Sequence, residues 1–121
     1  MRIISEEEFS IRIQEVLQDP IFNSVGWVTG PGRSGAIAAV YASHILHIPF
    51  VPFGSEAKHL ERPLIIDTAR QSGATLKKAI RKYQHLNPIS CVLYEEPPRV
   101  AFWYEGSKPQ HYKHEPKLRL H

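Results

Sequence analysis

The stretch LIIDTARQSGATLKKAI, residues 64–80, decides the fold. Its three opening aliphatic residues are typical of a strand that is buried on both faces of a parallel sheet. The chain then turns small and polar up to Gly73, and from about Thr75 apolar residues recur at helical spacing opposite a face of lysines. The order strand, turn, helix places Asp67 at the carboxyl end of a strand, which is the edge where open α/β sheets bind their ligands.

The turn in this stretch has the composition of a phosphate site. Backbone N–H groups at a glycine turn and at a helix N-terminus converge on an anion, and the helix dipole favours its charge. We predict that the phosphate-binding residues are Ala69, Arg70, Gln71, Ser72, Gly73, Ala74 and Thr75. Asp67 and Thr68, directly before them, are predicted to bind the hydroxyl groups of a ribose. The alternative is a turn capped by Ser72 or Thr75 that holds no ligand.

A second glycine-rich segment runs from Gly30 to Gly35, between a short strand at 27–29 and an alanine-rich helix at 36–46. Its glycines have the spacing of a dinucleotide-binding fingerprint, but such a fold needs an acidic residue at the end of the next strand and usually more strands. This chain offers only Glu56 and too few residues. Arg33 could pair with the oxygens of an anionic ligand through two parallel hydrogen bonds, or it could be a solvated loop residue.

Both segments resemble motifs of the type I phosphoribosyltransferases. The signature of that family for phosphoribosyl diphosphate is an apolar strand, two acids, three variable residues, Ser or Thr, Gly, any residue, and Ser or Thr. Asp67, Ser72, Gly73 and Thr75 match it. The segment at 30–35, followed by an alanine-rich helix and a short Ile-Pro strand, is similar to the family's diphosphate-binding loop. The resemblance covers about residues 25–95.

The resemblance implies a reaction and the residues that carry it. The phosphoribosyl group of phosphoribosyl diphosphate or of a nucleoside monophosphate would be transferred to or from a nucleobase, with diphosphate as the leaving group. Asp67 and Arg33 would be the catalytic residues, and Asp67 would also hold a Mg²⁺ cofactor. The residues that bind diphosphate would be Gly30, Gly32, Arg33, Ser34 and Gly35.

Two features depart from the pattern of active family members. Thr68 stands where the family usually has a second acid, and Gln71 stands where purine-type members carry an aspartate thought to act as general base. The interval 54–62, where active members carry a long flexible loop, has nine residues, which is too short for a lid that excludes water. The alternative to a transferase is therefore a catalytically silent protein that binds or senses a nucleotide on the same fold.

The remaining segments complete an α/β pattern. We predict a helix at 5–18 with Ser5 and Glu8 at capping-box spacing, an edge strand at 48–53, a helix at 75–83, and strands at 89–94 and 100–104. This order predicts a mostly parallel sheet with helices on both faces. In the last strand, Trp103 and Tyr104 are predicted to stack on the base, with core packing or a dimer interface as the alternative for each.

Length and composition fit one domain at 1–106, followed by a polar tail at 107–121. The net charge of +3 comes partly from that tail, so the expected partner is a small-molecule phosphoribosyl compound or nucleotide, and nucleic acid is unlikely. Cys91, the one cysteine, lies in an apolar run and is expected to pack in the core. We see neither a leader nor an apolar run of ~20 residues, which favours a cytoplasmic protein with no membrane partner. The family resemblance implies a homodimer.

Overall fold

The computed structural model of the chain describes residues 2–69, 73–95 and 100–105, and the structural statements below refer to these residues. The predicted phosphate-binding residues Arg70, Gln71 and Ser72 lie outside the described residues, as does the predicted tail at 107–121.

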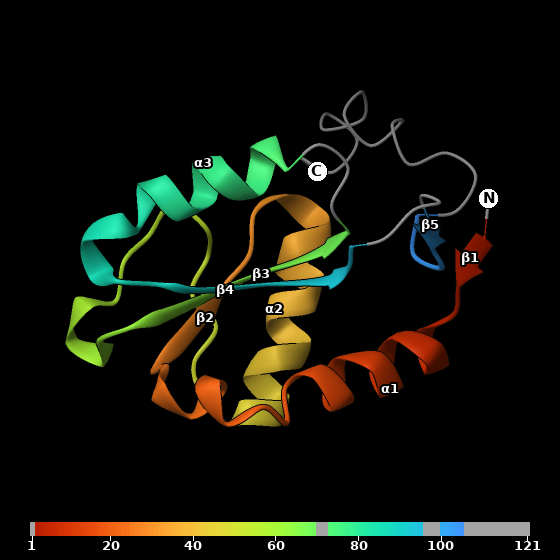
Figure 1. The fold of residues 1–121 in the computed structure, drawn as a ribbon, viewed down its shortest axis with the longest axis horizontal. Coiled ribbons are helices and arrows are strands. Elements are labelled where there is room, and N and C mark those ends of the chain that lie inside the picture. Colours follow the sequence, from red (N-terminus) through yellow and green to blue (C-terminus); the bar gives the residue numbers. More distant parts are fainter. Residues whose placement is uncertain (1, 70–72, 96–99, 106–121) are drawn as a thin grey trace, which may run out of the picture.

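A three-stranded parallel sheet forms the centre of the fold, in the order β2-β3-β4 (Figure 1). Its strands are β2 (Trp27–Thr29), β3 (Pro63–Ala69) and β4 (Ile89–Tyr94). Thr29 lies opposite Ile65, and Asp67 lies opposite Val92. Because the strands run in the same direction, their carboxyl ends lie at one edge. β3 is longer than the apolar run that predicted it and carries Asp67 and Thr68 within the strand.

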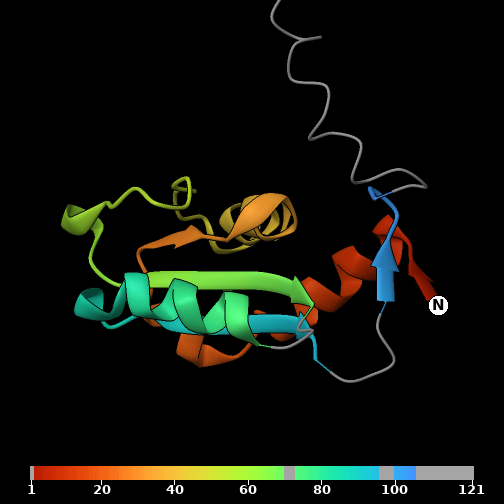
Figure 2. The same ribbon diagram turned by 90° about the horizontal axis from the view of Figure 1, so that it is seen from above.

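Helices cover both faces of this sheet, as predicted (Figure 2). The helices α1 (Glu6–Val16) and α2 (Gly32–Leu46) lie on one face, and α3 (Ala74–Lys82) lies on the other. Side chains alternate along β3, so Leu64 and Ile66 join the core beneath α1 and α2, whereas Ile65 joins Tyr83 in the core beneath α3. Three short 3₁₀ helices connect these elements: η1 (Pro20–Ser24), η2 (Lys58–Leu60) and η3 (Gln84–Leu86).

The starts of α1 and α2 follow from their local sequence. The hydroxyl of Ser5 accepts a hydrogen bond from the backbone N–H of Glu8 at 3.1 Å, which confirms the predicted cap. The helix predicted at 36–46 begins earlier, at Gly32, with Pro31 as its N-cap. Arg33 and Ser34 therefore belong to the first turn of a helix and not to a loop.

A second, two-stranded sheet lies beyond the carboxyl ends of β3 and β4 (Figure 1). It pairs β1 (Arg2–Ile4) with β5 (Val100–Phe102) in parallel, with Ile4 opposite Phe102. The last strand therefore ends before Trp103, and it does not join the main sheet. The strand predicted at 48–53 is reduced to one bridge between Phe50 and Val28.

The short interval at 54–62 is fastened to elements of the main sheet and α3. The indole N–H of Trp27, at the start of β2, donates to the carbonyl of Glu61 at 2.9 Å. The hydroxyl of Tyr83, directly after α3, accepts from the N–H of Gly54 at 2.6 Å and donates to the carbonyl of Ser55 at 3.0 Å. Both anchors lie at the amino edge of the sheet, opposite the carboxyl ends of the strands.

Within the part of the chain that the structure describes, no helix combines the length and the apolar character that a bilayer span requires.

Candidate functional site

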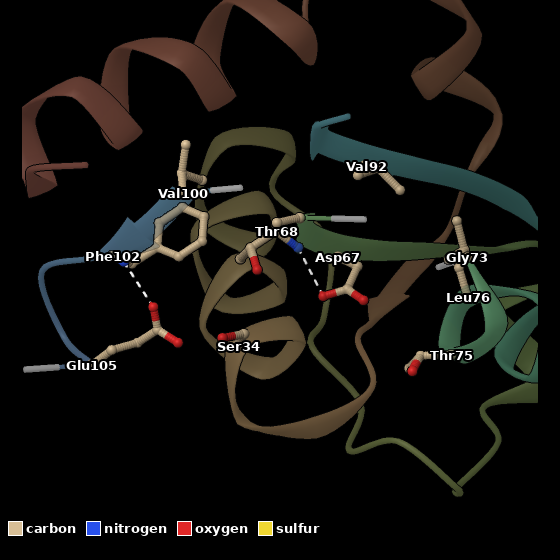
Figure 3. A pocket seen from close by; sticks show the side chains of 11 residues that line it. Ser34, Asp67, Thr68, Gly73, Thr75, Leu76, Val92, Val100, Phe102 and Glu105 are labelled. Atoms are coloured by element: carbon tan, nitrogen blue, oxygen red, sulfur yellow. Dashed lines mark hydrogen bonds between the residues drawn. The ribbon is translucent and has the colours of Figure 1, made fainter. Parts of the chain in front are cut away.

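A pocket of about 290 Å³ opens at the carboxyl end of β3 (Figure 3). Residues from five elements, brought together by the parallel sheet and by β5, form its wall. They are Ser34 from α2, Asp67, Thr68 and Ala69 from β3, Gly73, Thr75 and Leu76 at the start of α3, Val92 from β4, and Val100, Phe102 and Glu105 at β5 and the turn after it. Both glycine-containing turns of the sequence thus contribute to one pocket.

The start of α3 is built as the sequence predicted. Gly73 is the N-cap residue and has a φ of 83°, a left-handed conformation that glycine adopts without steric cost. It has no side chain with which to cap the helix. Thr75 lies in the first turn and lines the pocket. An anion at this point would meet N–H donors, a hydroxyl group and the positive end of the helix dipole.

Asp67 is the acid at the centre of the pocket. Its Oδ1 accepts a hydrogen bond from the backbone N–H of Thr68 at 2.8 Å, and no hydrogen bond from a described residue reaches its second oxygen (Figure 3). Burial raises the pKa of the Asp67 carboxyl above its usual value, and the hydrogen bond from Thr68 lowers it by less. A positive ligand group or a sugar hydroxyl beside it would stabilise the ionised form.

The residues present fit Mg²⁺ only in company with a ligand. No group of three histidine, cysteine or acidic side chains is arranged to hold a metal among the residues described. In phosphate sites, however, Mg²⁺ is commonly held by one or two carboxylates together with oxygens of the substrate. The second oxygen of Asp67 supplies one such ligand, so the assignment of Asp67 to the metal stays a prediction.

Thr68 and Tyr104 form a hydrogen-bonded link between the two sheets. Thr68 is 3% exposed. The hydroxyl of Tyr104 donates to Oγ of Ser34 at 2.7 Å and also hydrogen-bonds to the side chain of Thr68. Burial raises the pKa of Tyr104, while these two hydrogen bonds lower it. The residue at the second acidic position of the family motif is therefore bonded within the protein.

The two predicted base-binding residues, Trp103 and Tyr104, pack against other aromatic rings of the protein. Tyr104 lies parallel to Phe102, with ring centroids 5.6 Å apart, and Trp103 packs against Phe9 at 5.4 Å and Tyr41 at 6.5 Å. Neither is among the described residues that line the pocket. Their stacking on a base stays a prediction.

Arg33 and Ser34, the two predicted diphosphate-binding side chains in the first turn of α2, lie on different surfaces. Ser34 lines the pocket, whereas Arg33 is exposed, with its guanidinium carbon 5.8 Å from the ring centroid of Tyr104. Arg33 also borders an apolar hollow on the outer face of α2, beside Ile37 and Val40. Its pairing with diphosphate stays a prediction.

The glycines around this turn have packing roles. A Cβ atom on Gly30 would collide with the carbonyl groups of Gly35 and Ile66, so Gly30 lets the turn approach α2 and β3 closely. Gly32 begins the helix with a φ of 69°.

Glu105 and the side chains of β4 and β5 in the wall were not predicted to belong to the site. Val92, Val100 and Phe102 reach it through strand pairing, which the sequence does not specify. Glu105 reaches it through a turn in which its N–H donates to the carbonyl of Phe102 at 3.0 Å. The local sequence signal that could have pointed to Glu105 is its position as an acidic residue directly after the aromatic run 102–104.

Cys91 is 9% exposed, and its burial in the core of the α1 face confirms the packing role expected from the sequence. Burial raises the pKa of its thiol to about 11, so the reactive thiolate form is scarce at neutral pH.

Neither a protein-family model nor a curated protein sequence matches this chain. Solved structures do. A xanthine-guanine-hypoxanthine phosphoribosyltransferase from Helicobacter pylori has a TM-score of 0.68 and 17% identity, over 87% of this chain and 92% of that one. A purine phosphoribosyltransferase from Pyrococcus horikoshii has a TM-score of 0.66 and 18% identity, over 85% and 94%.

A hypothetical protein from Neisseria gonorrhoeae, solved with bound ppGpp, has a TM-score of 0.64 and 12% identity, and the match covers 97% of each chain. At such identities the likeness concerns the arrangement of helices and strands. The chain therefore has the phosphoribosyltransferase fold.

Proposed function

We propose that the pocket binds the 5-phosphoribosyl group of phosphoribosyl diphosphate or of a nucleoside monophosphate. We also propose that the chain transfers this group to or from a nucleobase, with diphosphate as the leaving group. The observation that carries the proposal is the shared pocket: Ser34 from the first turn of α2 and Thr75 from the first turn of α3 line it together with Asp67.

Two helix N-termini at one pocket suit a ligand with anionic groups at two positions, such as the 5-phosphate and the diphosphate of phosphoribosyl diphosphate. Neither α2 nor α3 has an acidic residue in its first turn, so no side chain of that turn opposes the binding of an anion at the positive end of the helix dipole. The 5-phosphate would bind at the start of α3. The diphosphate would bind at the start of α2, where Arg33 and Ser34 add donors.

Asp67 lies between these two ends and would orient the ribose through its free oxygen. In the transfer, the bond from C1 of the ribose to diphosphate breaks with its electron pair going to diphosphate, and a ring nitrogen of the base forms the new bond to C1. The Asp67 carboxylate would stabilise positive charge that develops on the sugar. Bound Mg²⁺ would neutralise charge on the diphosphate. Gln71 cannot accept the proton that the base loses, so that proton would pass to solvent.

The second candidate function is binding of a nucleotide without turnover. Two observations favour it: Thr68 is bonded to Tyr104 and does not supply a second acid, and the interval 54–62 is held by Trp27 and Tyr83 away from the pocket. The Neisseria gonorrhoeae structure, with ppGpp bound, is an example of a protein of this fold and nearly the same length that contains a nucleotide.

Calorimetric titration with phosphoribosyl diphosphate and nucleoside monophosphates, with and without Mg²⁺, tests the binding. Thr75→Val removes an exposed hydroxyl at the phosphate end, and we expect it to weaken binding by roughly tenfold or more, the value of one hydrogen bond to a charged group. Ser90→Ala, which removes an exposed hydroxyl from β4 outside the pocket, is the matched control.

Diphosphate release with a panel of nucleobases then separates the two candidates. Release with any base supports the transferase. Tight binding with no release from any base supports binding without turnover. Failure of both ligand classes to bind the folded chain rejects both functions.

A further inference from the structure

Besides Asp67, the described wall of the pocket contains one more carboxylate, that of Glu105. It is held in place by its own turn. The backbone N–H of Phe102 donates to Oε1 of Glu105 at 2.8 Å, and the N–H of Glu105 donates to the carbonyl of Phe102 at 3.0 Å. The first of these bonds holds the direction of the side chain, and no described residue bonds to its second oxygen.

Glu105 lies at the end of the pocket opposite the predicted phosphate turn (Figure 3). Gly73 and Thr75 are at one end, Asp67 and Thr68 are in the middle, and Phe102 and Glu105 are at the other end. A nucleoside monophosphate has its phosphate, ribose and base in the same order. If the phosphate lies against α3 and the ribose beside Asp67, the base reaches Glu105.

The chemistry of this end favours a particular kind of base. An ionised carboxylate accepts hydrogen bonds and donates none. Val100 and Phe102 make the wall at this end apolar, and no lysine or arginine belongs to the described wall of the pocket, so hydrogen-bond donors of a ligand are the partners that suit a carboxylate here. Guanine presents two adjacent donors, its ring N1–H and its 2-amino group. Hypoxanthine presents only N1–H, and adenine presents a lone pair at N1, which a carboxylate repels.

We propose that Glu105 is a specificity-determining residue and that it selects guanine nucleotides over adenine nucleotides. This inference rests on the proposed function, because it takes the start of α3 as the phosphate end. It applies equally to a transferase and to a protein that binds a nucleotide without turnover.

The test is a calorimetric titration of the full chain with GMP, IMP, AMP and, as a ligand without a base, phosphoribosyl diphosphate. We expect affinity to fall in the order GMP, IMP, AMP, with at least about tenfold between the first and the last, because a site built to bond N–H groups rejects a ligand that lacks them. Glu105→Gln keeps an oxygen for the N–H of Phe102 and turns an amide donor toward the base. It is expected to weaken GMP binding about tenfold and to leave phosphoribosyl diphosphate binding within twofold.

Glu15→Gln, the same change on the exposed surface of α1, is the control and should alter neither affinity. Equal affinities for GMP and AMP in the wild-type chain, with phosphoribosyl diphosphate still bound, would overturn the role of Glu105 and leave the proposed function standing. A Glu105→Gln chain that loses phosphoribosyl diphosphate as well would also overturn it, because the residue would then act on the whole pocket. A wild-type chain that binds none of the four ligands would overturn the proposed function together with this inference.

Discussion

The hydroxyl of Tyr104 ties β5 to the main sheet, and its removal by Tyr104→Phe measures how firmly β5 is held beside the pocket. Two hydrogen bonds are lost, one to Ser34 at 2.7 Å and one to Thr68. The ring is retained, and it still lies parallel to Phe102 at 5.6 Å. The change therefore isolates the hydrogen bonds from the aromatic packing.

The structure sets the expected size of the effect. Each hydrogen bond contributes about 1 kcal/mol to the free energy of unfolding. Thr68 is 3% exposed, so its hydroxyl has little access to water that could replace the lost partner. We expect a total loss of about 2 kcal/mol, which corresponds to a fall in Tm of roughly 5–10 °C for a domain of this size.

Urea denaturation followed by tryptophan fluorescence measures this loss. Trp103 lies 4.9 Å from the ring of Tyr104, so its emission reports on the segment that the substitution loosens. Tyr94→Phe is the matched control: its hydroxyl makes one long bond of 3.4 Å, to the half-exposed side chain of Glu8, and the loss of this bond should cost less than about 0.5 kcal/mol. If the two variants lose equal stability, the link between β5, α2 and β3 does not hold the pocket wall as argued.

Three further predictions concern the pocket and its support. Asp67→Asn should raise the free energy of unfolding at neutral pH while weakening ligand binding. Folding raises the pKa of Asp67, so ionisation of its carboxyl lowers the stability of the wild-type chain as the pH rises above the usual pKa of 3.8. Urea denaturation at several pH values should therefore show that the stability gained by Asp67→Asn shrinks as the pH falls toward 3.8. Gly30→Ala should lower stability by more than about 2 kcal/mol in thermal unfolding, because its methyl group meets two carbonyl groups, whereas Gly32→Ala, with open space around it, should cost about 1–2 kcal/mol for its positive φ alone. Tyr83→Phe should speed amide hydrogen exchange at Gly54 and leave nucleotide affinity unchanged, since the interval it holds lies away from the pocket.

The central fold could be predicted because its signals are local. The aliphatic run before Asp67 fixes β3, the glycine at 73 fixes the start of α3, and Ser5 fixes the start of α1. Each of these depends on residues that are adjacent in sequence. The short β1 was not predicted, because a strand of three residues has no measurable period and its partner, β5, lies almost a hundred residues away.

The site divides in the same way. Asp67 near the end of β3 and Thr75 in the first turn of α3 were predicted for the site from their local sequence, and both line the pocket. The turn at 30–35 was predicted as a loop because of its glycines, yet Pro31 caps a helix that already includes Arg33 and Ser34. The wall of the pocket formed by Val100, Phe102 and Glu105 depends on how β5 pairs with β1. That pairing carries Glu105 to the pocket and leaves Trp103 packed against Phe9.

The identity of residue 68 follows from the position of β5. An acid at this position would be almost fully buried, and beside Asp67 it would place a second negative charge at the end of β3, at a high cost in desolvation and repulsion. Threonine avoids that cost, because its hydroxyl bonds to Tyr104 and needs no ligand or metal to compensate it. The end of β3 is thereby left with one acid, Asp67, while the turn that brings Tyr104 to Thr68 also brings Glu105 to the far end of the pocket.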